Sequence, residues 1–415
     1  MAHVNVNQKL SSGMKAVADS TTAFAHTQGL WRFLHNDEMD LPTLSEPVVA
    51  LAKAEVPPAC DDYALSVHDW SRLNYYSHKS KRDRIQLSHK TDVGYDLQST
   101  ILVSDRDGLP IAVPAQNLVC SRGVLQSRDS KVRRKQPHLD ELSKRIDWLE
   151  AQDFGKPLVH IVDREADSVG HLRQWKDRNW VVRVKAGSTV RMGKKSYKAS
   201  VVGAQLTYTK EREVLYKGKR AIQWIGEAAV VLARKAKPKT KDKNGKRVSP
   251  IAGEPLPARL VVSRICNAKG MVLAEWFLLS NLPASVAAER IALWYYFRWE
   301  IESFFKLLKE AGHQLESWLQ ETADAIAKRL LIVAQACAVV WRLMRKEGAH
   351  AEEARAFLVR LSGRQMKRSC PVTPTALMDG FFKFLTMLET LQHHSLNDLK
   401  QMAQTVYPGR RWRFV

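Results

Sequence analysis

The sequence has no apolar run long enough to cross a bilayer. The longest one, residues 330–341, includes Gln335 and falls short of the roughly 20 residues that a membrane-spanning helix needs, so a buried helix is the better interpretation. The opening segment, MAHVNVNQKLSSGMK, also lacks the apolar stretch of a secretory signal. These absences argue against a membrane protein and predict a cytoplasmic location.

Cysteine is sparse and scattered along the chain. The five cysteines are an odd number and include no C-x-x-C pair; they are Cys60, Cys120, Cys266, Cys337 and Cys370. A disulfide framework and a cysteine zinc site therefore do not fit, whereas a reducing compartment does.

Acidic residues are outnumbered by basic ones. Lys and Arg number 65 against 43 Asp and Glu, which leaves a formal net charge of +22. This excess predicts a polyanionic partner, and nucleic acid is the first candidate because Lys and Arg contacts with phosphate release counterions. A basic protein without such a partner is the alternative. With 415 residues, 45% of them hydrophobic, the chain has the composition of a globular protein of about two or three domains.

Predicted strands and helices alternate in the first half of the chain. Continuous or alternating apolar patterns predict strands, and a period of 3.6 residues predicts helices. The strands cover residues 63–69, 97–104, 109–113, 157–162 and 180–184, and the helices cover 139–152 and 168–175. This order is typical of an α/β sheet of mixed direction.

The pattern differs on either side of that region. Residues 1–55 are predicted to be helical, with breaks near Pro42 and Pro47. Residues 187–282 are predicted to be mainly strands and contain a basic run, 234–247, which is either a solvated loop or a DNA-binding arm. After Pro283 the chain is predicted to be helical almost to its end.

Two acidic residues, Asp69 and Asp163, end predicted strands. Ligand sites form where the strands of an α/β sheet end. Carboxylates that converge there repel one another unless cations neutralise them, and hard ions such as Mg²⁺ prefer oxygen ligands. Asp105 and Asp107, by contrast, fall in a predicted hairpin turn and are interpreted as turn formers.

A helix predicted from near Ser285 carries a third acid. Five polar residues fall within one sector of this helix; they are Tyr295, Arg298, Glu302, Lys306 and Lys309. Glu300 projects elsewhere. One interpretation is a surface helix whose i,i+4 ion pairs contribute roughly 0.2–0.5 kcal/mol each. The two strand-end acids favour the other interpretation, in which Glu302 joins Asp69 and Asp163 in one site.

Two motifs resemble the signatures of bacterial DDE transposases of the insertion-sequence family four. They are Asp163-Arg-Glu-Ala-Asp167 followed by Leu172, and Tyr295-x₂-Arg298-x₃-Glu302-x₆-Lys309. The first acid is similar in context, with Val67-His-Asp69 followed by Leu73-Asn-Tyr75, and Trp276-Phe-Leu-Leu resembles the tryptophan of the family's insertion domain. The resemblance covers roughly residues 24–312.

The resemblance implies a fold and a division of the chain. The fold would be α/β: a ribonuclease-H-like mixed-sheet catalytic core, interrupted by a mostly β insertion, with helical segments at both ends. Residues 1–58 would be a helical DNA-binding segment, 59–186 the first part of the core and 187–283 the insertion with its basic loop. Residues 284–312 would be the catalytic helix that completes the core, and 313–415 a helical region for dimerisation.

The resemblance also implies a metal-dependent DNA transposase. Asp69, Asp163 and Glu302 would hold two Mg²⁺ ions, for which Mn²⁺ can substitute, during cleavage and strand transfer. Phosphate beside the cut would be held by Tyr295, Arg298, Lys306 and Lys309. Trp276 would stack on a base displaced while a DNA hairpin forms, or else be a packing residue. From their place in the sequence, Glu165 and Asp167 could also reach the metal, but they are interpreted as residues beside the ligands or at a helix N-terminus.

The implied partners are double-stranded DNA and a second copy of the chain. The DNA would be the terminal inverted repeats of an insertion sequence and the target, and the setting would be the bacterial cytoplasm at the nucleoid. Two other functions stay open: a ribonuclease-H-fold nuclease that does not join strands, and a DNA-binding relative without catalysis. The presence of all three acids argues against the second of these, and Trp276 together with the length of the insertion argues against the first.

Overall fold

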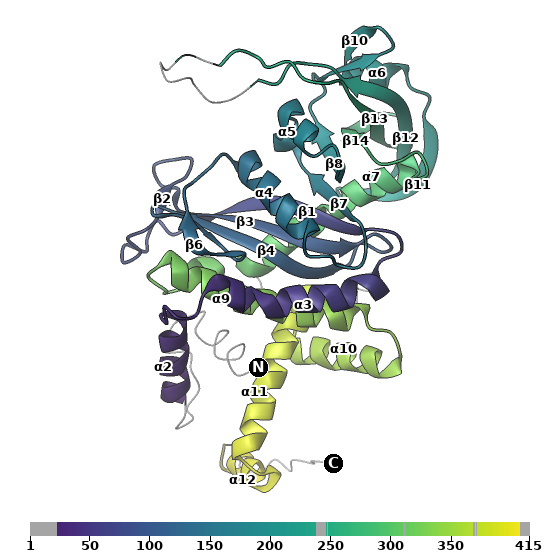
Figure 1. Ribbon diagram of the computed structural model, residues 1–415. Coiled ribbons are helices and arrows are strands. Elements are labelled where there is room, and N and C mark those ends of the chain that lie inside the picture. Colours follow the sequence, from purple (N-terminus) through teal and green to yellow (C-terminus); the bar gives the residue numbers. More distant parts are fainter. Residues whose placement is uncertain are drawn as a thin grey trace. The chain divides into compact units, whose positions relative to one another are not determined.

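Contacts between residues divide the protein into two compact units, which are described one at a time (Figure 1). The computed structural model describes residues 23–237, 246, 248–309, 313–367, 370 and 372–406. One unit spans residues 40–305, and the other combines residues 1–39 with residues 306–415. No helix within these described ranges is both long and apolar enough to cross a membrane.

The unit of residues 40–305 contains strands, with helices between them. The strands are β1 Ala64–Asn74, β2 Ile85–Gln86, β3 Val93–Ser104, β4 Pro110–Cys120, β5 Gly123–Gln126, β6 Asp129–Arg133, β7 Leu158–Val162, β8 Asn179–Val184, β9 Thr189–Met192, β10 Lys195–Lys198, β11 Thr209–Tyr216, β12 Lys219–Leu232, β13 Leu256–Cys266 and β14 Val272–Ser280. The helices are α3 Leu41–Ala59, α4 His138–Glu150, the 3₁₀ turn η3 Arg164–Ala166, α5 Val169–Gln174, α6 Ala199–Gln205, α7 Ala288–Phe297 and the start of α8 Trp299–Lys309.

These strands form one sheet of 14 strands. Its main order is β10-β9-β12-β13-β14-β8-β7-β1-β3-β4-β5-β6, with β11 beside β12 and β2 beside β3. β7 pairs in parallel with β1 and with β8, whereas β1 with β3, β3 with β4 and β14 with β8 are antiparallel. The predicted α/β sheet of mixed direction is therefore confirmed.

The register of β1 and β7 sets the position of two acids. In this parallel pair His68 lies opposite Val162, so Asp69 and Asp163 follow at the same level of neighbouring strands. β1 does not end at Asp69, however, and the prediction that it does is wrong. The strand continues to Asn74 because its second half stays paired with β3.

Residues 187–283 extend this sheet rather than starting a separate one. The region is mainly strands, as predicted, with the short helix α6 between β10 and β11. β14 pairs with β8 from Phe277 to Ser280, which joins the region's strands to the first part of the sheet. Of the basic run 234–247, residues 238–245 and 247 lie outside the described residues.

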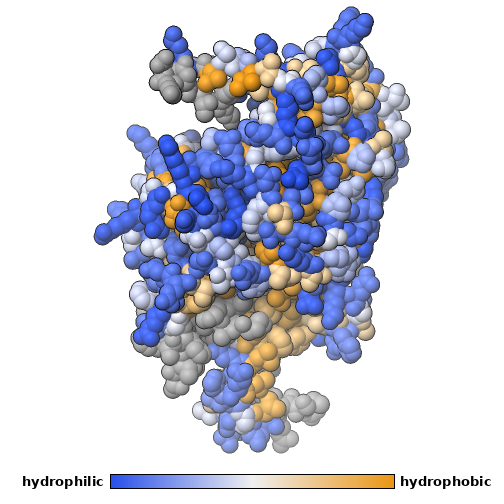
Figure 2. Space-filling model, viewed as in Figure 1, coloured by the Kyte–Doolittle hydropathy of each residue, from blue (hydrophilic) through white to orange (hydrophobic). Residues whose placement is uncertain are grey.

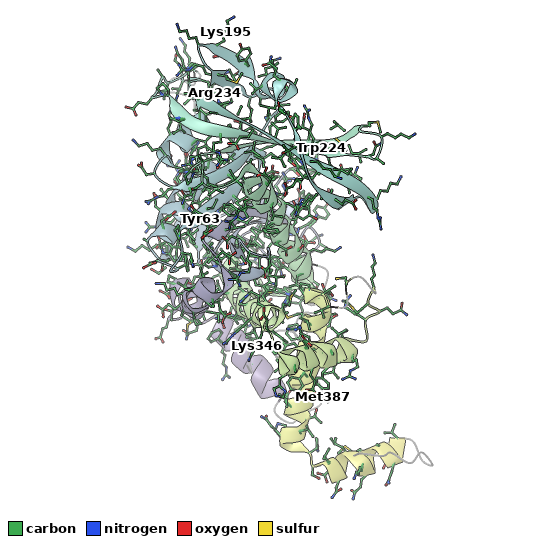
Figure 3. All side chains as sticks on the ribbon, turned by 90° about the vertical axis from the view of Figure 1, so that its right-hand side faces the viewer. Tyr63, Lys195, Trp224, Arg234, Lys346 and Met387 are labelled. Atoms are coloured by element: carbon green, nitrogen blue, oxygen red, sulfur yellow. The ribbon has the colours of Figure 1, made fainter. Side chains whose placement is uncertain are left out.

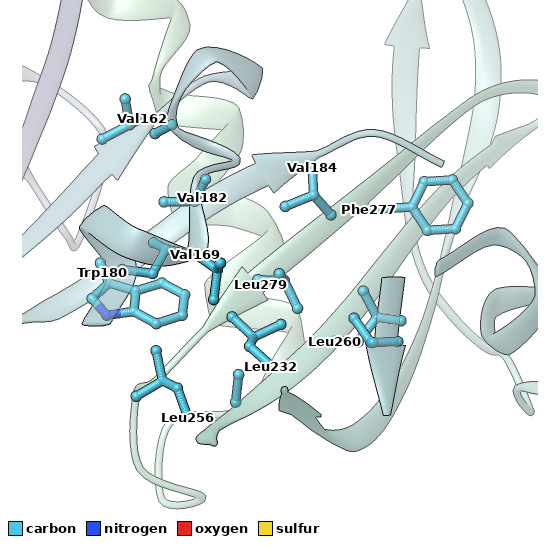
Figure 4. Close-up of a cluster of buried hydrophobic side chains, with 14 of the residues drawn as sticks. Val162, Val169, Trp180, Val182, Val184, Leu232, Leu256, Leu260, Phe277 and Leu279 are labelled. Carbon is cyan, nitrogen blue, oxygen red and sulfur yellow. The ribbon is translucent and has the colours of Figure 1, made fainter. Parts of the chain in front are cut away.

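A large hydrophobic cluster covers one face of the sheet beneath α4, α5 and α6 (Figure 4). Trp180 and Val182 of β8, Val262 of β13 and Phe277 of β14 are all buried in it. Leu142, Ile146, Leu172 and Val202 bring in the three helices. Burial of this apolar surface is the main force that holds the strands of residues 187–283 to the rest of the sheet.

Helix α3 contradicts one prediction from proline. Its first turn is capped by Asp40, whose carboxylate accepts a hydrogen bond from the Thr43 backbone N–H at 2.9 Å. Pro42 lies in the first turn, where a backbone N–H would have no acceptor within the helix, so its missing N–H costs nothing there. The predicted break near Pro42 is thus the start of the helix, but the break near Pro47 is wrong. Val48, Ala52 and Val56 are buried, and their burial offsets the hydrogen bond that Pro47 cannot make. Figure 1 shows α3 and α4 on opposite faces of the sheet.

The other unit is helical in its described residues. It contains α2 Ala23–Leu34, the 3₁₀ turn η4 Leu315–Ser317, α9 Ala323–Arg345, α10 Ala349–Ser362, α11 Pro374–His393 and α12 Leu396–Val406. Most of α9 is buried, including nearly all of the apolar run 330–341, so the buried-helix interpretation is confirmed. Apolar side chains on α11 and α12, such as Met387, Leu391 and Leu396, are exposed, and Figure 2 shows orange surface where α11 lies.

Gly94 provides a test of how tightly β1 and β3 pair. A Cβ added to Gly94 would lie 1.9 Å from the Leu73 carbonyl oxygen, so Gly94→Ala must push these two strands apart. We expect the free energy of unfolding in urea to fall by about 1–3 kcal/mol or more, the usual cost of overpacking. Gly187→Ala, where the added Cβ meets nothing within 4 Å, is the control and should stay close to wild type. Equal stability of the two variants would contradict the close pairing.

Candidate active site

The three predicted acids come from three elements of the unit of residues 40–305. Asp69 lies in β1, Asp163 caps η3 directly after β7, and Glu302 lies in the first turn of α8. Burial raises the pKa of Asp69 above its usual value, and the nearby carboxylates of Glu302 and Asp163 raise it further. Three carboxylates, far apart in the sequence, therefore act on one another in the folded chain.

Arg298 joins two of these acids. Its Nη1 donates to Asp69 Oδ2 at 2.9 Å, and its Nη2 donates to Glu302 Oε1 at 2.5 Å. The Arg298 side chain is only 5% exposed, whereas Glu302 is 41% exposed. Although burial alone would lower it, contacts with Tyr295, Glu302 and Asp69 raise the pKa of Arg298 above its ordinary value. The guanidinium is a permanent positive charge held between the acids.

Two further residues contact the third acid. The Tyr295 hydroxyl donates to Asp163 Oδ1 at 3.1 Å, and Arg183 Nη1 of β8 lies 3.7 Å from the same oxygen. Burial raises the pKa of Tyr295, and the charge of Asp163 adds to the effect, so the hydroxyl keeps its proton. The predicted residues Tyr295, Arg298, Asp69, Asp163 and Glu302 are thus brought together.

The helix that carries them is not quite continuous. The chain predicted as one helix from near Ser285 forms α7 and α8, with a turn at Arg298 between them. Lys306 and Lys309 follow in α8 but belong to the other unit, in which Lys309 lies 3.6 Å from Glu316. The site described here is accordingly built from residues of the unit 40–305 alone.

Asp105 positions α7, a role that sequence reasoning missed. Its buried carboxylate accepts hydrogen bonds from the backbone N–H groups of Asp61, Asp62 and Tyr63, and it lies 3.2 Å from Arg290 of α7. Its carbonyl accepts from Trp294 Nε1 at 3.1 Å. The prediction that Asp105 is a turn former is therefore too narrow. Asp107 does act as one, because its carboxylate accepts from the Leu109 backbone N within the turn.

His138, at the start of α4, holds the turn that follows Asp163. Its Nε2 lies 3.0 Å from Asp96 of β3 and its Nδ1 lies 3.4 Å from Glu165, while its ring packs on Trp70, the residue after Asp69. Hydrogen bonds with Asp96 and then Glu165 raise the pKa of His138 to about 9. Glu165 is thus tied to β3 through His138. Asp167 is bound by Ser188 and Arg234.

A buried histidine pair supports the two acid-bearing strands from behind. His68 of β1 and His160 of β7 share a hydrogen bond of 3.0 Å, and the chain of contacts continues to Thr100 at one end and Glu150 at the other. Burial holds the pKa of His68 well below its ordinary value, with the charges of His160 and Arg145 adding to the effect. His68 is therefore a neutral ring that fixes β1 against β7. The only sequence signal was a histidine one residue before Asp69 and another three residues before Asp163.

Trp276 and Glu300 lie outside the set of residues that contact the three acids. Trp276 is half-buried on β14, and strand alternation puts it on the face of Leu278, which pairs with Arg183. It therefore shares a face of the sheet with the arginine that contacts Asp163. Glu300 is half-buried apart from the acids, and burial raises the pKa of Glu300 to about 7.

The donor chemistry of the acids suits a hard divalent cation, because three carboxylates supply the oxygen ligands that Mg²⁺ prefers. Within the described ranges, no three His, Cys, Asp or Glu side chains are arranged to hold a metal ion as they stand. In this site Arg298 donates a hydrogen bond to one carboxylate oxygen of Asp69 and to one of Glu302. Comparison of the sequence with known protein families and with curated proteins gives no match.

The role of His138 predicts a particular dependence of stability on pH. A folded-state pKa of about 9 against an ordinary value of 6.5 means that protonated His138 stabilises the fold fully below pH 6.5. That contribution is lost as the pH rises through about 9. His138→Gln should therefore lower the free energy of unfolding most at pH 6.5 and below, and least above pH 9, as measured by urea unfolding at each pH.

Asp96→Asn is the matched control for this measurement. Because Asp96 is the strongest cause of the raised pKa, its loss should remove most of the same pH-dependent difference. A His138→Gln effect that is equal at all pH values would show that the ring acts by packing on Trp70 alone.

Proposed function

We propose that the protein is a DDE-type DNA transposase, similar to those of the insertion-sequence family four, that cuts and joins DNA at the ends of an insertion sequence. The observation that carries the proposal is the bridge from Asp69 through Arg298 to Glu302. Three residues predicted from motifs far apart in the chain meet there. Asp163, which belongs to the motif of residues 163–167, accepts a second contact from Tyr295 beside this bridge.

The proposed core is ribonuclease-H-like. In support of this, β1 lies at the centre, with β3 and β4 following it as antiparallel neighbours on one side. On the other side β7 and β8 run parallel to it, with α4 in the connection before β7 and α5 in the one before β8. The two strand-borne acids come from adjacent parallel strands, where sites of α/β sheets form.

Asp69, Asp163 and Glu302 would hold two Mg²⁺ ions, or Mn²⁺, which when bound activate the attacking oxygen and stabilise the leaving one. The chain's own residues would position the DNA. Arg298 can grip a phosphate through two parallel hydrogen bonds, and the protonated Tyr295 hydroxyl can donate one more. Lys306 and Lys309, which belong to the other unit, stay predicted phosphate contacts, as the resemblance implies. His138 would keep the turn with Glu165 in place while DNA is bound.

Exposed positive charge on other parts of the sheet supports DNA as the partner. Exposed lysines lie at the β9–β10 hairpin, including Lys194 and Lys195, and at the β11–β12 turn, including Lys217 and Lys219; Figure 3 shows Lys195. Such residues would contact phosphate without reading sequence. The proposed substrates are terminal inverted repeats and target DNA, bound by two copies of the chain in the bacterial cytoplasm.

The acids give the first test of this proposal. Asp69→Asn, Asp163→Asn and Glu302→Gln should each lower Mg²⁺-dependent cleavage of duplex DNA at least about a thousandfold. That loss exceeds the 10- to 100-fold cost of removing a group that only supports a metal ligand. Folding and DNA binding should persist, because each change relieves repulsion among the acids. Cleavage is measured on end-labelled duplexes that carry the repeats flanking the gene.

Glu300→Gln is the matched control, since Glu300 lies two residues from Glu302 on the same helix but apart from the acids. It should keep most of the activity. Full cleavage by the Asp69 and Glu302 variants would exclude the proposed chemistry and leave a DNA-binding protein. Cleavage by wild type without any joined product would instead identify a nuclease.

Trp276 separates a transposase from a nuclease. Hairpin formation requires a base at the DNA end to leave its stack, and aromatic stacking on that base is worth roughly 1–3 kcal/mol. Trp276→Ala should leave first-strand nicking nearly intact and slow hairpin formation about tenfold for each 1.4 kcal/mol lost. Denaturing gels would then show nicked DNA accumulating.

Trp224→Ala is the control for this change. Trp224 is also half-buried, on β12, but it pairs with Arg264, one residue out of phase with the Ile225–Ser263–Trp276 row. It therefore faces the side of the sheet opposite to Trp276; Figure 3 labels Trp224. Equal slowing of nicking and hairpin formation in Trp276→Ala would make Trp276 a packing residue.

A further inference from the structure

Arg298 lies where its charge satisfies the acids but its own hydrogen bonding is incomplete. Both Nη atoms are used, one on Asp69 and one on Glu302. Its Nε, by contrast, is buried and has no hydrogen-bond partner among the described residues. A buried donor without an acceptor costs free energy. In the observed position the two carboxylates have a cationic partner, whereas one hydrogen-bond donor of the arginine has no acceptor.

A phosphate group would satisfy what this position leaves unmet. Phosphate oxygens accept two parallel hydrogen bonds from one guanidinium, so Nε and one Nη can be used together. A guanidinium keeps its proton in proteins, so Arg298 cannot release the acids by becoming neutral. It can release them only by moving.

Movement of Arg298 would change the acids sharply. Asp69 and Glu302 would each lose the guanidinium hydrogen bond that now covers one carboxylate oxygen. Uncovered like charges of this kind bind a divalent cation strongly. Phosphate that draws the arginine away and metal that binds the freed acids would therefore favour each other, and such coupling is reciprocal.

We propose that Arg298 is a two-position residue that blocks metal binding at Asp69 and Glu302 until a DNA phosphate draws it away. The inference rests on the proposed function and adds a form of regulation to it. Metal would load efficiently only when DNA is in place. Tyr295 and Trp299, whose rings lie 5.9 and 5.3 Å from the guanidinium carbon, line the space around the side chain.

The test measures Mn²⁺ binding to the full chain, from the electron paramagnetic resonance signal of free Mn²⁺, without any activity assay. In the absence of DNA, Arg298→Gln should bind Mn²⁺ about tenfold more tightly than wild type, within the usual range of such couplings. A short duplex of mixed sequence should tighten Mn²⁺ binding to wild type by a similar factor and leave the variant unchanged. Arg178→Gln, an arginine of the same unit that contacts Asp147, should behave like wild type.

The outcomes separate this inference from the function on which it rests. Equal Mn²⁺ affinity of wild type and Arg298→Gln, with binding lowered by Asp69→Asn, would overturn the two-position role and leave the metal site standing. Mn²⁺ binding that Asp69→Asn does not affect would overturn the proposed function itself. If circular dichroism shows that Arg298→Gln does not fold, wild type decides alone, because an affinity that DNA leaves unchanged would overturn the proposal.

Discussion

Like-charge repulsion is the constraint around which the site is organised. Asp163 and Glu302 lie close enough to Asp69 for their charges to raise its pKa. The folded chain must offset this repulsion to keep the three carboxylates together. Arg298 does so for two acids, while Tyr295 and Arg183 contact the third. The same cations that make the acidic cluster tolerable in the free protein are the groups best suited to holding a phosphate.

The scaffold around the cluster is built to keep it from relaxing. A buried histidine pair binds β1 to β7, His138 anchors the turn after Asp163, and Asp105 holds α7 against the strands. These contacts are polar and buried or half-buried, so breaking any of them leaves an unsatisfied group. These contacts thus hold negatively charged side chains close together, at a cost in folding free energy. Such an arrangement is typical of functional sites rather than of a hydrophobic core.

Much of this arrangement could be predicted from sequence, and the failures have physical causes. Periodicity located β7, β8 and α4, and helical spacing put Arg298 beside Glu302, because these depend on local patterns. The apolar pattern stops at Asp69 and therefore predicts a strand end there, yet β1 continues through polar residues paired with β3. Pro47 and Asp105 misled for a related reason: burial by distant segments overrode a local preference. No local pattern could have revealed that His138 reaches Glu165 and Asp96, since those contacts depend on the assembled sheet.

The pairing of β14 with β8 has a consequence for the integrity of the sheet. Without that pair, β8 would present an open edge of unpaired backbone groups, which invites pairing with other chains. Residues 187–283 therefore act as a cover for this edge as well as a platform for Trp276. Removing β14 would expose a buried, valine-rich strand to its neighbours in solution. The residues before β13 matter for a different reason, because Val202 and Val230 belong to the hydrophobic cluster that holds this region to the sheet.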